Sequence, residues 1–541
     1  MGRYGIVNSV SVQGSRFFSL VRVWVIGIGL LTSAGVVAQN ADTNPAVDRS
    51  PADIVMSLML KKAESLAASD FESHTEEIPE VLQDMNYEQY RSIYYRRDAG
   101  LWRDDGQFEV QFFHPGFLYT EPVAIRLVDK EGAHKRFPFD PSLFRYGDQS
   151  KELAEMSAVE GTGYSGFRVH YPINMADKKS EFVVFQGASY FRIVGPNQFY
   201  GISARGLAVD TAEPGGEEFP VFREFWLLKP DPDETVMTVF ALLDSASVTG
   251  AYRFDLEPGS PTAVKVEAHV FARKDIIKLG VAPLTSMYLH GENSVVRPDD
   301  FRPEVHDSDG LMMQTNTGEW VWRPLDNPRQ LQVSSLQDTN PKGFGLMQRD
   351  RDFSHYLDAE AHYHQRPSFW VEPLGDWGDG RVELVEIPTS TETNDNMVAY
   401  WVANKAVKAG DRLTYRYRVS TWGETVTAHD LARVKRTRIG WAAMPGQDNP
   451  PPKAHRKFIV DFHAGPLDSL SEELQLKADL SASSGEVKDI VVSKLPQSDS
   501  WRVAFTLIPG ADPVDMRLAL NWQDKRLSEV WSYVWYPNTV E

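Results

Sequence analysis

Short runs of β-forming residues, separated by turn residues, recur over most of this chain of 541 residues. From Phe108 onward, runs rich in Val, Phe, Tyr, Ile and Thr alternate with Gly, Pro, Asn and Asp for some 300 residues. This rhythm is typical of a β-sandwich and not of alternating strands and helices. We expect strands at Phe108–Phe113, Phe182–Gln186, Val236–Leu242, Ala263–Ala272, Gly318–Trp322, Val382–Ile387 and Leu413–Val419. One helix, capped by Asp53, is expected over Ile54–Ala68.

A second β series begins near Phe458. Six or seven short strands in about 100 residues have the size and spacing of an immunoglobulin-like domain, and its core would depend on Trp501, Trp522, Trp531 and Trp535. The segment 423–457 is poor in long apolar runs and contains three consecutive prolines, so we interpret it as a linker and loop. We therefore predict an all-β protein with a large N-terminal β-sandwich over 39–422 and a smaller one over 458–541.

The predicted linker contains a basic run, Arg433 to Arg438, in an otherwise acidic chain. Two interpretations are open for it. It is either a solvated or interdomain face, which is the common role of a charge run, or a loop that reaches over a binding groove.

The first 38 residues have the pattern of a secretion signal. Arg16 and Arg22 precede an apolar run, and small residues end it at Ala38. The alternative is a membrane anchor, which the short apolar run and the lack of following charges disfavour. The chain has no cysteine, so disulfides, thiol nucleophiles and Cys-bound metals are excluded. An exported, acidic protein without cysteine is expected in a bacterial periplasm.

The formal net charge of −19 excludes some classes of partner. An acidic surface repels nucleic acid and anionic membranes, so neither is an expected partner. A neutral polysaccharide is compatible with this charge.

Aromatic rings and carboxylates gather between Arg366 and Trp401. This stretch contains three tryptophans and the carboxylates of Glu372, Asp376, Asp379, Glu383, Glu386, Glu392 and Asp395. Sugar rings stack on aromatic faces, and a protonated carboxyl group can cleave a glycosidic bond. We expect this stretch and a second acidic one, Asp299 to Asp309, to meet across one groove. The competing interpretation is that most of these acids are solvated, and Glu383 fits a partly exposed strand.

Other catalytic motifs are absent from the sequence. There is no Walker loop, GxSxG, HExxH or dinucleotide fingerprint. His362 and His364 lie two residues apart, but scattered surface histidines are more common than metal ligands. Asp307 to Gly310 resembles only part of a calcium loop. We expect neither a metal nor a cofactor.

Ten strings together resemble one protein family. They are FFHPGF (112–117), GASYFR (187–192), YGISARGLAVDT (200–211), EEFPVF (217–222), LLDSASVTGAYRF (242–254), APLTSMY (282–288), RPEVHDSDGL (302–311), GEWVWRPL (318–325), NPKGFGLMQRDRDF (340–353) and RPSFWVEPLGDWG (366–378). The family is that of the bacterial periplasmic glucan biosynthesis proteins G and D (OpgG/OpgD, also written MdoG/MdoD). The resemblance covers essentially the whole mature chain.

The resemblance implies a galactose-mutarotase-like sandwich followed by an immunoglobulin-like domain. It implies a role in the biosynthesis of osmoregulated periplasmic glucans, whose backbone is β-1,2-linked glucose, with an inverting endo-β-1,2-glucanase as the expected activity. A transglycosylase of the same fold, and a non-catalytic glucan-binding scaffold beside a membrane glucosyltransferase, stay open. A homodimer is also left open. The lack of an Arg-Arg pair in the signal favours the G type over the D type.

The resemblance also assigns site residues. The general acid falls on Asp395 and the base, which acts through water, on Asp307. Glucosyl-binding roles fall on Glu392, Arg366 and Tyr363, and stacking roles on Tyr356, Trp370 and Trp377. For the two tryptophans, core packing is an equal alternative. We expect Asp395 to hold its proton, aided by repulsion from Glu392, and Asp307 to stay ionised.

Overall fold

The computed structural model describes residues 50–73, 78–156, 162–423, 429–496 and 498–537. Strands account for 47% of it and helices for 10%, which confirms the predicted mostly-β class. The predicted signal segment lies outside the described residues. Within the described ranges, no helix has the length and apolar character needed to cross a bilayer.

The first large sheet has ten strands, each antiparallel to its neighbours. Its order is β2 (Glu109–Phe113), β6 (Gly166–Met175), β7 (Lys178–Gln186), β8 (Tyr190–Ile193), β9 (Ser203–Arg205), β15 (Leu279–Ser286), β24 (Met397–Ala403), β23 (Asp379–Glu386) and β20 (Gln332–Thr339), with β10 (Leu207–Val209) also paired to β15.

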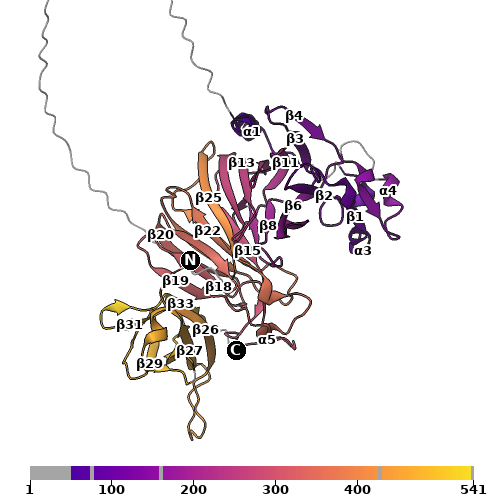
Figure 1. The fold of residues 1–541 in the computed structure, drawn as a ribbon. Helices are drawn as coiled ribbons and strands as arrows, with labels where there is room; N and C mark the ends of the chain where they lie inside the picture. Colours follow the sequence, from indigo (N-terminus) through magenta and orange to yellow (C-terminus); the bar gives the residue numbers. More distant parts are fainter. Residues whose placement is uncertain (1–49, 74–77, 157–161, 424–428, 497, 538–541) are drawn as a thin grey trace, which may run out of the picture. The chain divides into compact units, whose positions relative to one another are not determined.

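The second large sheet has fifteen strands (Figure 1). Its order is β28 (Lys477–Ala482), β31 (Val514–Trp522), β33 (Val530–Trp535), β19 (Trp320–Pro324), β18 (Gly310–Gln314), β21 (Gly343–Met347), β22 (Ser368–Pro373), β25 (Arg412–Trp422), β14 (Ala263–Ala272), β13 (Val248–Glu257), β12 (Met237–Asp244), β11 (Val221–Leu228), β3 (Ala124–Val128) and β4 (His134–Phe137), with β32 (Lys525–Arg526) paired to β31.

The remaining elements are short. They are α2 (Glu80–Gln83), α3 (Tyr87–Arg91), α4 (Leu153–Met156), α5 (Phe353–Tyr356), the 3₁₀ turns η2 (Arg97–Ala99), η3 (Pro141–Leu143), η4 (Tyr363–Gln365) and η5 (Gly465–Ser469), and the strand pairs β1 (Ile93–Tyr95) with β5 (Phe144–Tyr146) and β16 (Tyr288–His290) with β17 (Val305–His306).

One hydrophobic core joins the two large sheets. The ring of Phe225, from β11, lies 5.0 Å from that of Phe167 on β6 and 5.3 Å from that of Phe185 on β7. On β14, Val264 and Val266 join this core, and the alternate residue Lys265 is exposed. The alternation of apolar and polar residues along such strands therefore decides which face is buried.

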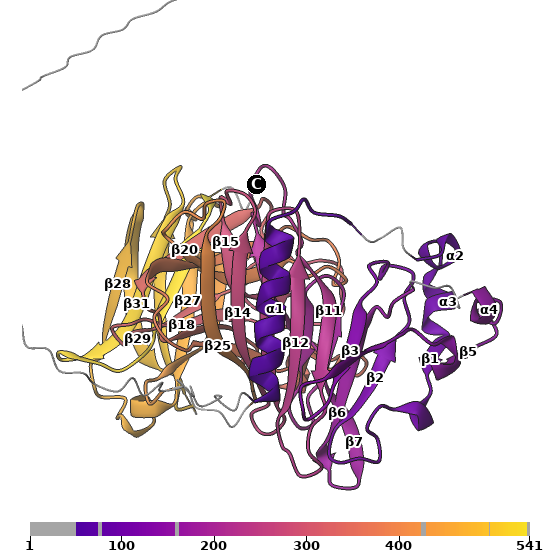
Figure 2. The same cartoon turned by 90° about the horizontal axis from the view of Figure 1, so that it is seen from above.

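Helix α1 (Pro51–Ala67) covers the other face of the fifteen-stranded sheet at β12, β13 and β14 (Figure 2). Val55, Met59 and Ala63, spaced four residues apart, are fully buried against it. The helix begins three residues earlier than predicted, because Ser50 and not Asp53 caps it: the Ser50 hydroxyl accepts from the Asp53 N–H at 3.2 Å. Proline at the first helical position needs no hydrogen-bond partner for its nitrogen, which favours this start.

The C-terminal strands contribute to two sheets. A four-stranded sheet has the order β26 (Arg433–Trp441), β27 (Arg456–His463), β30 (Trp501–Ile508) and β29 (Glu486–Lys494). The others join the fifteen-stranded sheet, where Val530 of β33 pairs in parallel with Val321 of β19. Strand β26 lies within the segment that we predicted as a linker.

Three of the four tryptophans expected in the C-terminal core are buried there: Trp501, Trp531 and Trp535. Trp522 is 37% exposed, because it lies at the end of β31. Glu383 lies on strand β23, as predicted, but the expected partial exposure was wrong. It is only 3% exposed, since Lys278 and Arg381 pair with its carboxylate within the sheet.

Candidate functional site

Asp307 lies in the short connection between β17 and β18. Its backbone N–H donates to the carbonyl oxygen of Met287 at 2.8 Å, which fixes the connection. The side chain is nearly buried, and its Oδ1 forms an ion pair with Nη1 of Arg366. Burial raises the pKa of Asp307 to about 6, the Arg366 guanidinium opposes this rise, and the negative charge of Asp395 adds to it.

Arg366 follows the 3₁₀ turn η4 and is held on several sides. Its Nε and Nη2 donate to the carbonyl oxygen of Ala361 at 3.1 and 2.9 Å. Its Cζ lies 4.2 Å from the centroid of the Tyr363 ring, a cation–π arrangement. A Cβ at Gly201 would lie 2.9 Å from Cδ of Arg366, so only glycine allows this close approach. The guanidinium is thereby positioned in advance against Asp307.

Glu392 joins the two acidic stretches. Its Oε2 accepts from the Tyr363 hydroxyl at 2.7 Å and from Nη1 of Arg302 at 2.8 Å. The same Nη1 pairs with Asp358 at 2.8 Å, and Nη2 of Arg302 pairs with Asp300 at 2.7 Å. The segments 299–309 and 366–401 therefore contact each other through Arg302–Glu392 and Arg366–Asp307.

Asp395 lies in the loop between β23 and β24. The adjacent Asn396 is buried and fixes this loop: its Oδ1 accepts from the Tyr288 N–H at 2.8 Å and its Nδ2 donates to the Ile387 carbonyl at 2.9 Å. The Asp395 side chain itself is exposed.

Although exposed, the Asp395 carboxyl group is surrounded by enough protein to lose part of its hydration. This loss raises its pKa, and the positive charges of Arg192, Arg205 and Arg366 oppose the rise. Glu392 was expected to raise this pKa by repulsion. That expectation was wrong, because Arg302 and Tyr363 engage the Glu392 carboxylate, and burial and the three arginines dominate the pKa of Asp395.

Sequence reasoning missed the arginines on strands β8 and β9. Nε of Arg192 donates to the Ser203 hydroxyl at 2.7 Å. Arg205 is buried, donates to Glu217 at 2.6 Å and lies 4.8 Å from the ring centroid of Tyr190. Both lie in strings that carried the family resemblance, GASYFR and YGISARG, and this was the available signal.

Three predicted stacking residues are buried instead of facing a ligand. Trp370 stacks on Trp422 at 5.1 Å, and Trp377 donates from Nε1 to the Arg416 carbonyl at 3.3 Å. Tyr356 is fully buried. The two tryptophans are 6% and 7% exposed, so packing, the alternative left open for them, describes their position.

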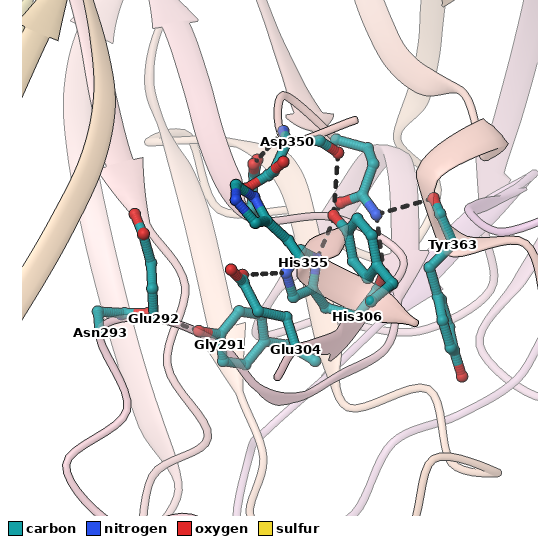
Figure 3. Close-up of polar contacts among 12 residues, drawn as sticks. Gly291, Glu292, Asn293, Glu304, His306, Asp350, His355 and Tyr363 are labelled. Atoms are coloured by element: carbon teal, nitrogen blue, oxygen red, sulfur yellow. Dashed lines mark hydrogen bonds and ion pairs between the residues drawn. The ribbon is translucent and has the colours of Figure 1, made fainter. Parts of the chain in front are cut away.

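A buried polar cluster surrounds His306, the residue that precedes Asp307 in the sequence (Figure 3). Nε2 of His306 lies 3.0 Å from Oε2 of Glu304, and Nδ1 lies 2.9 Å from Oε1 of Gln348. The Gln348 amide donates to the backbone carbonyls of His306 and Tyr363, at 2.9 and 3.1 Å. Burial lowers the pKa of His306, but Glu304 outweighs this and raises it. The cluster thus ties the Asp307 connection to the turn that carries Tyr363.

The same cluster contains one group with metal-ligand geometry. Ligand atoms of Glu304, Asp350 and His355 lie within 4.8 Å of one another. Nδ1 of His355 is already 2.5 Å from Oδ2 of Asp350, and Lys435 and Arg436 line the cavity beside them. These two cationic side chains would repel a divalent cation, so we do not assign a metal to this group of ligand atoms.

A mostly-β protein that gathers carboxylates, guanidinium groups and phenol groups in one place has the chemistry of a carbohydrate-handling protein. The family model described as "Periplasmic glucan biosynthesis protein, MdoG" matches residues 56–535. The chain belongs to this family, as its sequence strings predicted. The family's periplasmic character confirms the predicted location, and the protein takes part in periplasmic glucan biosynthesis.

Curated relatives carry both the G and the D name. The chain is 44% identical to the probable glucans biosynthesis protein D of Shewanella oneidensis, over 88% of this chain and 87% of that one. It is also 44% identical to the glucans biosynthesis protein G of Ralstonia nicotianae, over 88% and 95% of the two chains. The glucans biosynthesis protein G of Vibrio cholerae is 42% identical, over 88% and 86%. Equal identity to both types does not favour either one.

Proposed function

We propose that this protein is an inverting endo-β-1,2-glucanase that acts on the β-1,2-glucan backbone. The observation that carries the proposal is the Asp307–Arg366 pair together with the electrostatic coupling of Asp307 to Asp395. Inverting glycosidases need two carboxyl groups that act on one glycosidic bond from opposite faces of the sugar.

The two aspartates have different roles in this mechanism. Asp395 gives its proton to the glycosidic oxygen as the bond from C1 to that oxygen breaks. Water attacks C1 from the opposite face, and the proton that it loses passes, through further water, to Asp307. A pKa of about 6 leaves Asp307 mostly ionised at neutral pH, as a base requires.

Asp395 must be protonated to act as the acid. A bound saccharide would displace water from its exposed carboxyl group and strengthen the effect of burial, which already raises this pKa. Glu392, Arg366 and Tyr363 would bind glucosyl hydroxyl groups. Tyr356, Trp370 and Trp377 are left out of the proposed site because they are buried.

The finer fold assignment belongs to the same proposal. We infer a galactose-mutarotase-like sandwich over 39–422 and an immunoglobulin-like domain over 458–541. The shared core of the two large sheets supports the first domain, and the four-stranded sheet supports the second. Because β26 belongs to that sheet, the second domain would begin near Arg433 and not at 458.

One observation favours a second candidate, a non-catalytic glucan-binding scaffold beside a membrane glucosyltransferase. Asp395 is exposed, and three arginines stabilise its ionised form. An ionised Asp395 would bind a hydroxyl group but could not protonate a leaving oxygen.

Digestion of linear β-1,2-glucan separates these candidates. The mature protein, Asp395→Asn, Asp307→Asn and the control Asp376→Asn, an exposed acid of the same stretch, are each incubated with the polymer, and chain length and reducing ends are followed. The proposal expects shortening by the wild type and the control, and at least a hundredfold loss in both site variants. Cyclic or longer products with few new reducing ends would identify a transglycosylase. An intact polymer across pH, with retained binding, would identify the scaffold.

A further inference from the structure

A cavity of about 490 Å³ lies where strand β26 meets the segment 347–352. It includes part of the basic run that the proposed glucanase mechanism does not use. Five cationic side chains and two histidines line it: Arg349, Arg351, Arg433, Lys435, Arg436, His355 and His463. In a protein of net charge −19, so many cations around one cavity require an explanation.

Two of these cations already have acidic partners. Arg349 forms a bidentate pair with Glu529, at 2.6 and 3.0 Å. Glu529 also accepts from the Val434 N–H at 2.7 Å, so its oxygens are occupied. Arg436 lies 3.3 Å from Glu292, which Arg438 also approaches and which accepts from the Thr437 N–H at 3.1 Å. Burial and Glu304 raise the pKa of Glu292 to about 8 against the opposing charges of the two arginines. Because two arginines share this carboxyl group, it offsets the charge of Arg436 only in part.

Arg433 and Lys435 form no ion pair with any acid in the part of the chain that the structure describes. Arg433 is half-buried, and burial and the nearby Arg349 lower its pKa; the charge of Glu529, which is paired with Arg349, opposes this only in part. A guanidinium in this position is destabilised unless an anion comes close to it.

The backbone of β26 turns basic side chains toward the cavity. Its pairing with β27 shifts between Val434, opposite Phe462, and Arg436, opposite Asp461, which leaves Lys435 as an extra, bulged residue. Such bulges re-aim side chains. As a result, the consecutive residues Lys435 and Arg436 both line the cavity.

The two acids that line the cavity, Asp350 and Asp352, form contacts with groups other than Arg433 and Lys435. Asp350 pairs with His355. Asp352 caps helix α5, accepting from the Ser354 N–H at 2.9 Å, and its side chain is exposed. Neither neutralises Arg433 or Lys435.

We propose that this cavity binds an anionic group, a phosphate or a carboxylate, held by Arg433 and Lys435 with Arg349 and Arg351 beside them. Guanidinium groups bind both anions in bidentate geometry, and a lysine ammonium adds a point charge. The anion can be free in solution or attached to a saccharide. An anion attached to a saccharide fits the position of the cavity. Arg351, in the cavity wall, donates from Nη1 to the carbonyl oxygen of Arg366 at 2.8 Å, so the cavity lies next to the proposed sugar site.

Binding is tested with the full mature chain by calorimetry and thermal unfolding. The probes are inorganic phosphate, glucose 6-phosphate and, at matched ionic strength, glucose with sodium chloride. The variant Arg433→Gln/Lys435→Gln removes both unpaired cations, and Arg433→Gln alone serves if the double variant is unstable. Lys477→Gln, an exposed lysine on β28, controls for the change of net charge.

The expected result is saturable binding of phosphate by the wild type and Lys477→Gln, with affinity at least about tenfold weaker in the Arg433 variants. Tighter binding of glucose 6-phosphate than of inorganic phosphate would identify a saccharide-borne anion as the ligand, and equal binding a free anion. The proposal is overturned if phosphate acts no differently from chloride, or if the Arg433 variants bind it as well as the wild type. None of these measurements depends on glucan cleavage.

Discussion

Arg366 and Asp307 form an ion pair in which hydrogen bonds to the backbone hold the arginine in place. Two guanidinium nitrogens of Arg366 donate to the carbonyl oxygen of Ala361, so only Nη1 is directed at Asp307. Because the arginine cannot easily move away, its charge permanently favours the ionised form of a carboxyl group that burial would otherwise protonate.

Replacing Arg366 by Met should therefore raise the pKa of Asp307 above about 6. The acidic limb of any pH-dependent glucan cleavage or binding would move to higher pH, since Asp307 must be ionised to act. Loss of a charge-assisted hydrogen bond should also weaken glucan binding by about 1.5–3 kcal/mol. A pH series of binding and turnover checks both effects. Arg412→Met, which removes an exposed arginine paired with Glu64, should change neither.

Tyr363→Phe keeps the ring beneath Arg366 and removes only the hydroxyl group that donates to Glu392. Stability should change by about 1 kcal/mol or less, because Arg302 still engages Glu392. If Glu392 binds glucosyl hydroxyl groups, affinity for β-1,2-glucan should fall by roughly tenfold. Tyr94→Phe, an exposed tyrosine, is the control. Unchanged affinity would mean that Glu392 does not contact the saccharide.

The strands were predictable because burial follows the alternation of residues, as on β14. The burial of Glu383 was not predictable, because its partner Lys278 is more than 100 residues away in the sequence. A local pattern cannot show that such an ion pair forms across a sheet. The strand in the predicted linker was hidden by its charge, since Val434 and Thr437 are buried but basic residues surround them.

The site could be predicted only where a motif identified it. The string RPEVHDSDGL for Asp307, and the family resemblance for Asp395, assigned these candidate residues before any geometry was known. The aromatic content of the stretch 366–401 was misleading, because Trp370 and Trp377 are in the core. Whether an aromatic ring is buried or exposed depends on which sheet covers it, and composition does not contain that information.

Trp377→Ala tests the packing role of this tryptophan. Its ring lies 6.1 Å from that of Trp401 and contacts Tyr415 and Tyr417 edge-on. Truncation should lower the free energy of unfolding by about 3–5 kcal/mol, because a large cavity replaces the ring. Urea unfolding gives this value, and Trp377→Phe should cost less. A variant of wild-type stability that has lost affinity for glucan would instead show that Trp377 is a stacking residue.

The low pKa of Glu529 predicts that the folded protein loses stability in acid. Burial alone would raise its pKa, but the charge of Arg349 and the hydrogen bond from His429 lower it to about 2. The pKa in the folded protein is thus below the unfolded value of roughly 4.3. The ionised group therefore stabilises the fold above the unfolded pKa, and this contribution disappears as the pH falls from about 4 toward about 2.

Glu529→Gln should accordingly lower the free energy of unfolding at pH 7 by about 3–5 kcal/mol, because Arg349 loses its buried partner. The difference between variant and wild type should shrink as the pH falls below about 4, because the unfolded chain then binds a proton that the folded carboxylate accepts only toward pH 2. Urea unfolding at several pH values measures it, in buffers without phosphate because Arg349 lines the proposed anion cavity. Glu486→Gln, an exposed pair with Lys488, should show no such dependence. A difference that stays constant down to pH 2 would show that the ion pair does not set the acid sensitivity.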